Sequence, residues 1–127
     1  MTFRYGATLR NNQASQIQTT VGGSGLLKIF SGAEPANCAA ADPSGLLATI
    51  ALPATFLTSA AGVTTIAGSW SVAASGAGTA ACFRIYDGSA VCHLQGNVTT
   101  DLVLNNTSIA IGQTVTVTAF TVTAGNA

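Results

Sequence analysis

The sequence predicts an all-β protein: an antiparallel β-sandwich or barrel-like fold with one N-terminal helix. Beyond residue 25, short stretches of alternating apolar and polar residues recur, and turn-forming residues separate them. Threonine and valine, which suit pleated strands, are abundant in these stretches. We therefore expect an N-terminal arm and helix over residues 1–25 and a β-sandwich domain over residues 26–127.

The predicted helix spans residues 8–21, where apolar side chains recur near helical spacing. That apolar stripe consists of Leu9, Ala14, Ile17 and Val21. Thr8 is a residue type that caps a helix N-terminus. The glycine-rich segment 22–25 then ends the helix. It is not a phosphate-binding loop, because such a loop precedes its helix.

After the helix, apolar residues recur at every second position, which is the spacing of β-strands. The strands are expected at residues 26–31, 46–52, 54–58, 63–72, 81–86, 91–95, 102–104, 108–111 and 114–123. Asp87-Gly88 is the strongest hairpin signal in the chain and joins two of them. The long segment 31–45 is expected to be either a functional arm or a cover over the sheet.

The last strand changes phase within its length. Val115 and Val117 share one face, whereas Phe120 and Val122 share a face of opposite parity. If all four are core residues, one extra residue must intervene, which predicts a β-bulge at Thr118-Ala119. The alternative is a strand that is covered on both faces.

Charge is scarce: only 6% of the 127 residues are charged, and the formal net charge is zero. A typical soluble domain is roughly 25% charged. A surface made of small and hydroxyl-bearing residues is expected to be covered by neighbouring subunits. The charge balance excludes nucleic-acid binding by counterion release. No apolar run is long enough to span a membrane, so no membrane partner is expected.

The first residues lack the apolar core of a signal peptide, so folding in a cytosol is expected. The cysteines are Cys38, Cys82 and Cys92, an odd number that argues against a disulfide framework. We predict that all three are reduced. Strand parity places Cys82 and Cys92 on opposite faces of their hairpin, which forbids a disulfide between them.

Candidate chemistry is sparse. Cys82, Cys92 and His93 are close in sequence, but no Cys-x₂-Cys pair exists and neighbouring strand residues point apart, so no metal or cofactor is expected. His93 could act as the base for one of the many serines, with Asp87 or Asp101 orienting the imidazole, yet no G-x-S-x-G motif occurs. The turn itself explains Asp87. We therefore predict that the chain is not an enzyme.

Three aromatic residues, Phe30, Trp70 and Tyr86, are candidates for a sugar-binding patch. Packing in the core or between subunits is the favoured interpretation of all three.

Several segments together resemble a known family, in their order and spacing along nearly the whole chain. They are 8–11 (TLRN), 26–32 (LLKIFSG), 35–37 (PAN), 46–49 (LLAT), 83–87 (FRIYD), 93–96 (HLQG), 105–109 (NNTSI), 112–115 (GQTV) and 123–127 (TAGNA). The family is that of small phage and prophage virion structural proteins. Cys82 and Cys92 depart from it, since a small or apolar residue is expected there. The resemblance implies a virion component and carries over no catalytic residue.

The leading hypothesis is a capsid decoration (cement) protein, assembled into the virion in the host cytoplasm. Its expected partners are the major capsid protein and copies of itself. The alternatives are a neck, tail or fibre-associated virion protein and a carbohydrate-binding module on the virion surface. Segments 1–25 and 31–45 are the expected contact regions. The candidate interface residues are Phe3, Tyr5, Leu9, Ile17, Pro35 and Trp70.

Overall fold

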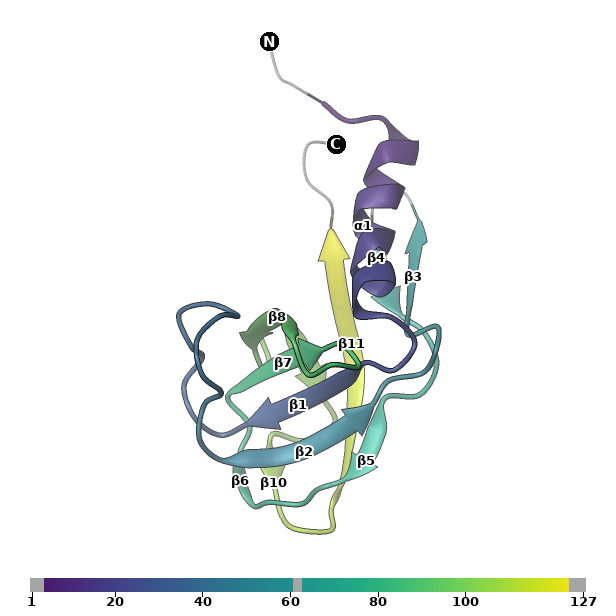
Figure 1. The fold of residues 1–127 in the computed structure, drawn as a ribbon. Helices are drawn as coiled ribbons and strands as arrows, with labels where there is room; N and C mark the ends of the chain where they lie inside the picture. Colours follow the sequence, from purple (N-terminus) through teal and green to yellow (C-terminus); the bar gives the residue numbers. More distant parts are fainter. Residues whose placement is uncertain (1–3, 61–62, 124–127) are drawn as a thin grey trace.

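The computed structural model describes residues 4–60 and 63–123, and it confirms a mostly antiparallel β fold with a single N-terminal helix (Figure 1). Its elements are α1 (Ala7–Val21), β1 (Leu26–Phe30), β2 (Leu46–Ala51), β3 (Leu57–Ala60), β4 (Val63–Ile66), β5 (Ser71–Ala73), β6 (Gly78–Thr79), β7 (Cys82–Tyr86), β8 (Cys92–Asn97), β9 (Leu102–Leu104), β10 (Ser108–Ile109) and β11 (Thr114–Thr123). The predicted hairpin of β7 and β8 is present.

The strands form two main sheets and a small one. The first sheet has four strands in the order β2-β1-β7-β8. The second has five: β3-β4-β11-β5 lie in a row, and β9 also pairs with β11. β6 and β10 form a two-stranded sheet. β11 organises the second sheet, because successive parts of it pair with β5, β9 and β4.

The core lies between the two main sheets. Phe83 of β7 meets Phe120 of β11 edge to face, with ring centroids 5.6 Å apart. Leu27, Ile29 and Ile50 of the first sheet are fully buried in the same cluster. This packing of one apolar face on another is how a β-sandwich buries its strands.

The helix is close to its predicted bounds but has a different N-cap. Gly6 occupies the N-cap position and makes no side-chain cap bond, so the prediction that Thr8 caps the helix is wrong. Thr8 lies inside the first turn, because the helix begins at Ala7. At the other end Gly22, with φ +80°, donates its N–H to the Gln18 carbonyl at 2.9 Å, which confirms the glycine stop.

α1 packs against β3 and β4 at the end of the molecule (Figure 1). Val21 is buried in the core and Ile17 is half-buried against it. Gln18 accepts a hydrogen bond on its Oε1 from the Leu57 N–H at 2.7 Å. That bond ties the helix to the first residue of β3.

The predicted bulge in β11 is confirmed. Val117 pairs with Leu104 and Ala119 pairs with Val103, which leaves Thr118 as the extra residue. The bulge returns Phe120 to the buried face that Val115 and Val117 occupy. The side chain of Val122 lies outside the described part of the chain.

The single strand predicted over residues 63–72 is wrong, because it breaks into β4 and β5. Gly68 adopts φ +75° between them, a conformation that a strand does not use. The break redirects Trp70 into the core, where its Nε1 donates to the Ala67 carbonyl at 3.2 Å. The short strand predicted at 54–58 begins later, at Leu57.

Gly68→Ala is expected to lower the free energy of unfolding by about 1–2 kcal/mol. A Cβ at this position would take up a strained φ of +75° and lie 2.8 Å from Cγ of Pro53. Urea denaturation measures the loss. Gly23→Ala is the matched control, because an added Cβ there meets only Ala54, at 4.0 Å. An equal loss in both variants would contradict the assignment of strain to Gly68.

Candidate functional site

Residues 31–45, here called the cover loop, lie over the outer face of the first sheet. Ser31 and Gly32 donate their N–H groups to the carbonyls of Gly45 and Ser44, at 2.9 and 3.0 Å, and so close the base of the loop. All five residues of β7 beneath it are buried. Of the two roles expected for this segment, the fold therefore supports the cover.

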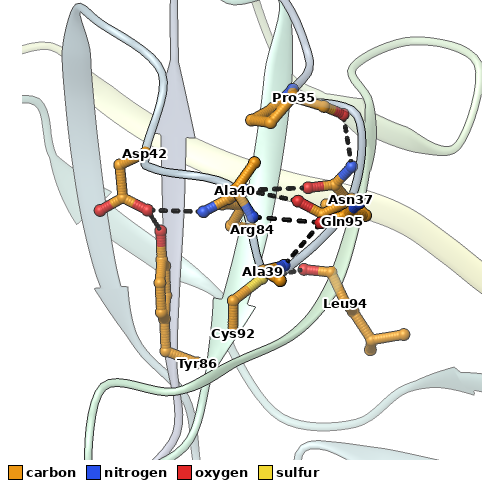
Figure 2. Close-up of polar contacts among 10 residues, drawn as sticks. All are labelled: Pro35, Asn37, Ala39, Ala40, Asp42, Arg84, Tyr86, Cys92, Leu94 and Gln95. Atoms are coloured by element: carbon orange, nitrogen blue, oxygen red, sulfur yellow. Dashed lines mark hydrogen bonds and ion pairs between the residues drawn. The ribbon is translucent and has the colours of Figure 1, made fainter.

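Arg84 of β7 is the centre of the contacts under the cover loop (Figure 2). Its guanidinium donates from Nη1 to Asp42 Oδ1 at 2.8 Å. Nη2 donates to the Asn37 carbonyl at 2.9 Å and to Gln95 Oε1 at 3.2 Å. The Arg84 side chain is only 2% exposed. One buried cation thus binds two points of the cover loop and the neighbouring strand β8.

Two further contacts complete this cluster (Figure 2). The Tyr86 hydroxyl donates a short hydrogen bond to Asp42 Oδ1. Gln95 donates from Nε2 to the Pro35 carbonyl at 2.7 Å. The cluster satisfies two main-chain carbonyls of the cover loop, those of Pro35 and Asn37.

The cover loop is shaped by its own sequence at Asn37. The Asn37 side-chain oxygen accepts the N–H groups of Ala39 and Ala40, at 2.9 and 3.1 Å. This local turn leaves the Asn37 main-chain carbonyl directed at Arg84. The loop is therefore preformed where the sheet binds it.

The electrostatics of the cluster favour an ionised Asp42. The hydrogen bond from Tyr86 holds the pKa of Asp42 below its ordinary value of 3.8, and the Arg84 guanidinium acts in the same direction. Burial and the Asp42 hydrogen bond raise the pKa of Tyr86, so the phenol stays protonated and remains a donor.

A groove of about 220 Å³ lies between α1 and β8. Its lining residues are Gln13, Gln16, Ile17, Thr20, His93 and Leu94. At its edge His93 Nε2 lies 2.9 Å from Asp87 Oδ2. Asp87 Oδ1 accepts the N–H groups of Ser89 and Val91, at 2.8 and 3.0 Å, which confirms the turn role predicted for Asp87.

His93 and Asp87 are the only part of the predicted nucleophilic arrangement that the described residues bring together. A triad also requires a hydroxyl or thiol that is bonded to the second nitrogen of the imidazole. Among residues 4–60 and 63–123, the imidazole of His93 is hydrogen-bonded to Asp87 alone. The hydrogen bond from His93 lowers the pKa of Asp87 and so favours its ionised form. The ionised carboxylate also accepts the N–H groups of the turn, so the pair stabilises that turn.

Acidification is expected to destabilise the fold below about pH 4. Asp42 and Asp87 both have folded-state pKa values below the ordinary 3.8. Their stabilising contribution is therefore complete above the unfolded pKa and is lost as the pH falls through the lower, folded value. Urea midpoints measured from neutral to acidic pH should be flat and then fall.

In this pH series Asp42→Asn should show a shallower fall than the wild type, because it removes one of the two carboxyl groups whose pKa the fold lowers. A midpoint that rises on acidification would contradict the assignment.

The predicted interface residues do not form one surface. Leu9 is 48% exposed on the first turns of α1, whereas Ile17 packs against the core. Tyr5 is half-buried before the helix, and Pro35 is half-buried in the cover loop. The cover loop lies away from α1 (Figure 1). Phe3 lies outside the described residues.

Trp70 corrects an expectation, because it cannot serve as an interface anchor. Its side chain is 1% exposed, and its ring centroid lies 5.9 Å from those of both Phe56 and Phe120. Phe30 and Tyr86 are also buried. None of the three aromatic candidates is therefore available as a sugar-binding platform: Trp70 packs in the core, Tyr86 belongs to the polar cluster under the cover loop, and Phe30 is buried as well.

The cysteines are all free, but the predicted face of Cys92 is wrong. The β7–β8 register shifts so that Ile85 pairs with Leu94 while Tyr86 pairs with Cys92. The shift makes His93 an extra residue and turns Cys92 to the outer face. Cys82 is on that face too, at the opposite end of the hairpin, where it pairs with Asn97.

Sequence reasoning missed Arg84, Asp42 and Asn37 as a set. One signal was present: Arg84 is a lone charge in a strand whose other residues are apolar or aromatic. A charge in such a strand requires a partner. Nothing local pointed to Asp42, which is 42 positions away.

Together, the fold and this site define a β-sandwich protein in which a polar cluster fixes a loop over the first sheet. The chain matches no family model, and neither a curated protein nor a solved structure is significantly similar to it. Within the described ranges, no group of three or more His, Cys, Asp or Glu side chains is arranged to bind a metal. In the described part of the chain α1 is the single helix, and it is too short and too polar to cross a membrane.

Proposed function

We propose that this chain is a non-catalytic structural protein of a phage virion, a capsid decoration protein that binds the major capsid lattice together with copies of itself. The observation that carries the proposal is the absence of charged residues from the strands of the second sheet. Its five strands, β3, β4, β5, β9 and β11, contain no Asp, Glu, Lys or Arg. A protein that works alone in water relies on surface charge for dispersal.

The outward side of the second sheet carries a row of threonines. Thr65 of β4 pairs with Thr58 of β3 on one side and with Thr121 of β11 on the other. Residues that are paired directly share a face, and all three are exposed. Hydroxyl groups cost far less to bury in an interface than charges do. This threonine row is the surface that we assign to contact with neighbouring subunits.

Most charged side chains of the chain contact a partner within it, which supports the same proposal. Arg84 pairs with Asp42, and Asp87 pairs with His93. Lys28 lies 5.0 Å from the centre of the Tyr86 ring, and Asp101 accepts the Asn97 N–H at 2.8 Å. Glu34 contacts Gln95. These six charged side chains therefore already have polar or aromatic partners within the chain, which lowers the cost of covering them.

The burial of Trp70, Phe30 and Tyr86 makes the carbohydrate-binding alternative the weaker one. Sugar-binding modules stack pyranose rings on exposed aromatic side chains, and these three candidates are not exposed. A neck or tail protein could bind its neighbours through the same uncharged surface. Whether the chain is present in purified heads or in tails distinguishes the two locations.

Thr65→Lys is expected to weaken association with particles about tenfold or more while leaving the fold intact. The added ammonium group would stand in the middle of the threonine row, where it would be buried without a partner. Particles of the encoding phage are banded in a density gradient, and the chain is quantified in the band. Thr100→Lys, in an exposed turn, is the matched control and should be incorporated like the wild type. Equal incorporation of both variants would contradict the assigned surface.

A further inference from the structure

Two cysteines that are far apart in sequence meet between the cover loop and the first sheet. Cys38 belongs to the cover loop and Cys92 begins β8, and both are half-buried. The Cys92 thiol donates to the Leu94 carbonyl at 3.3 Å, and it lies near enough to the Cys38 side chain for that group to raise the Cys92 pKa. Figure 2 shows Cys92 extending toward the chain at Ala39, the residue after Cys38.

The position of Cys38 is fixed from both sides. The preceding residue, Asn37, is bound through its carbonyl by Arg84 at 2.9 Å. The following residue, Ala39, donates its N–H to the Asn37 side chain at 2.9 Å. Cys38 is therefore held over the sheet by contacts that do not involve its own sulfur.

The position of Cys92 depends on the register shift in the β7–β8 hairpin. Without the extra residue at His93, Cys92 would share the core-facing side with Leu94 and Ile85. With it, Cys92 pairs with Tyr86 on the side that the cover loop occupies. The third cysteine does not compete, because Cys82 donates its Sγ–H to the Gly32 carbonyl at 3.3 Å, at the other end of β7.

We propose that Cys38 and Cys92 form a reversible disulfide that locks the cover loop to β8. Each thiol loses its hydrogen and one S–S bond forms between the two sulfurs. The two electrons and two protons reduce a small-molecule disulfide, such as oxidised glutathione, to two thiols. The bond closes the chain between residues 38 and 92 into a loop, which restricts the unfolded state. This inference does not depend on the proposed function.

Burial, together with the neighbouring Cys38 side chain, raises the pKa of Cys92 to about 12. The thiolate is the attacking species in disulfide exchange. The test therefore uses native, full-length protein, a large excess of oxidised glutathione and a long incubation. The reaction is quenched with acid, the protein is unfolded and its remaining thiols are counted.

Wild type should fall from three thiols to one, and its intact mass should drop by two hydrogen atoms. Cys82→Ser should lose both of its thiols in the same way. Cys38→Ser and Cys92→Ser should show no such loss of mass. A reductant should restore the thiols, and the oxidised wild type should unfold at a higher urea concentration than the reduced form.

Retention of all three thiols by the wild type would overturn the proposal. So would glutathione adducts as the sole product, a disulfide that includes Cys82, or a disulfide that joins two chains. Peptide mapping of the oxidised wild type identifies the bonded pair.

Discussion

Trp70→Ala will lower the free energy of unfolding by about 4 kcal/mol, because it empties the centre of the core. The indole is 1% exposed and contacts the rings of Phe56 and Phe120. Alanine leaves a cavity that those rings cannot fill, and it orphans the Ala67 carbonyl that accepts the indole N–H. Urea denaturation followed by far-ultraviolet circular dichroism measures the loss without relying on tryptophan fluorescence.

Ile111→Ala is the control for this measurement. Ile111 is 72% exposed in the turn before β11, so its truncation should change stability by less than about 0.5 kcal/mol. If Trp70→Ala is as stable as this control and loses only its association with particles, Trp70 is an interface anchor and the core assignment is contradicted.

Arg84→Ala is expected to cost about 3 kcal/mol and to release the cover loop from the sheet. The change removes charge-assisted hydrogen bonds to Asp42, Gln95 and the Asn37 carbonyl. It also leaves a cavity where a buried side chain packed. Urea denaturation measures the stability, and digestion with a protease of broad specificity should cut the cover loop faster than in wild type.

Asp42→Asn is the matched variant for Arg84→Ala. The Asp42 side chain is 46% exposed, and an asparagine oxygen can still accept from Arg84 and Tyr86. We expect a loss of only about 1 kcal/mol and little change in digestion. Protection of the cover loop in Arg84→Ala equal to that in wild type would show that other contacts hold the loop.

The parts of the fold that the sequence predicts are those with a local pattern. The change of parity between Val117 and Phe120 is visible in the sequence, and the bulge at Thr118 follows from it. The Asp87-Gly88 turn and the glycine stop of α1 are equally local. In each case the signal and its cause lie within a few residues of one another.

The errors arise where distant contacts decide the structure. The break at Gly68 is needed to bring Trp70 between Phe56 and Phe120, which no local pattern shows. The register shift at His93 reverses the face of Cys92, although the alternation of Cys92 and Leu94 looked regular. Tertiary packing overrides local periodicity at both positions.

The candidate site was less predictable than the fold for the same reason. The sequence of the cover loop is compatible with a functional arm and with a cover over the sheet. The contact with Arg84, which favours the cover, joins residues 47 positions apart. The interface prediction stays a prediction at exposed residues such as Leu9, and it is corrected at Trp70, because a large aromatic suits a core and an interface equally.

The most direct test of the proposed function is to quantify the chain in purified, tailless heads of the phage that encodes it. We predict that the chain is present in these heads at a fixed, stoichiometric ratio to the major capsid protein. Its absence from the heads, whether it is found in tails alone or in no particle at all, would contradict its assignment as a capsid decoration protein.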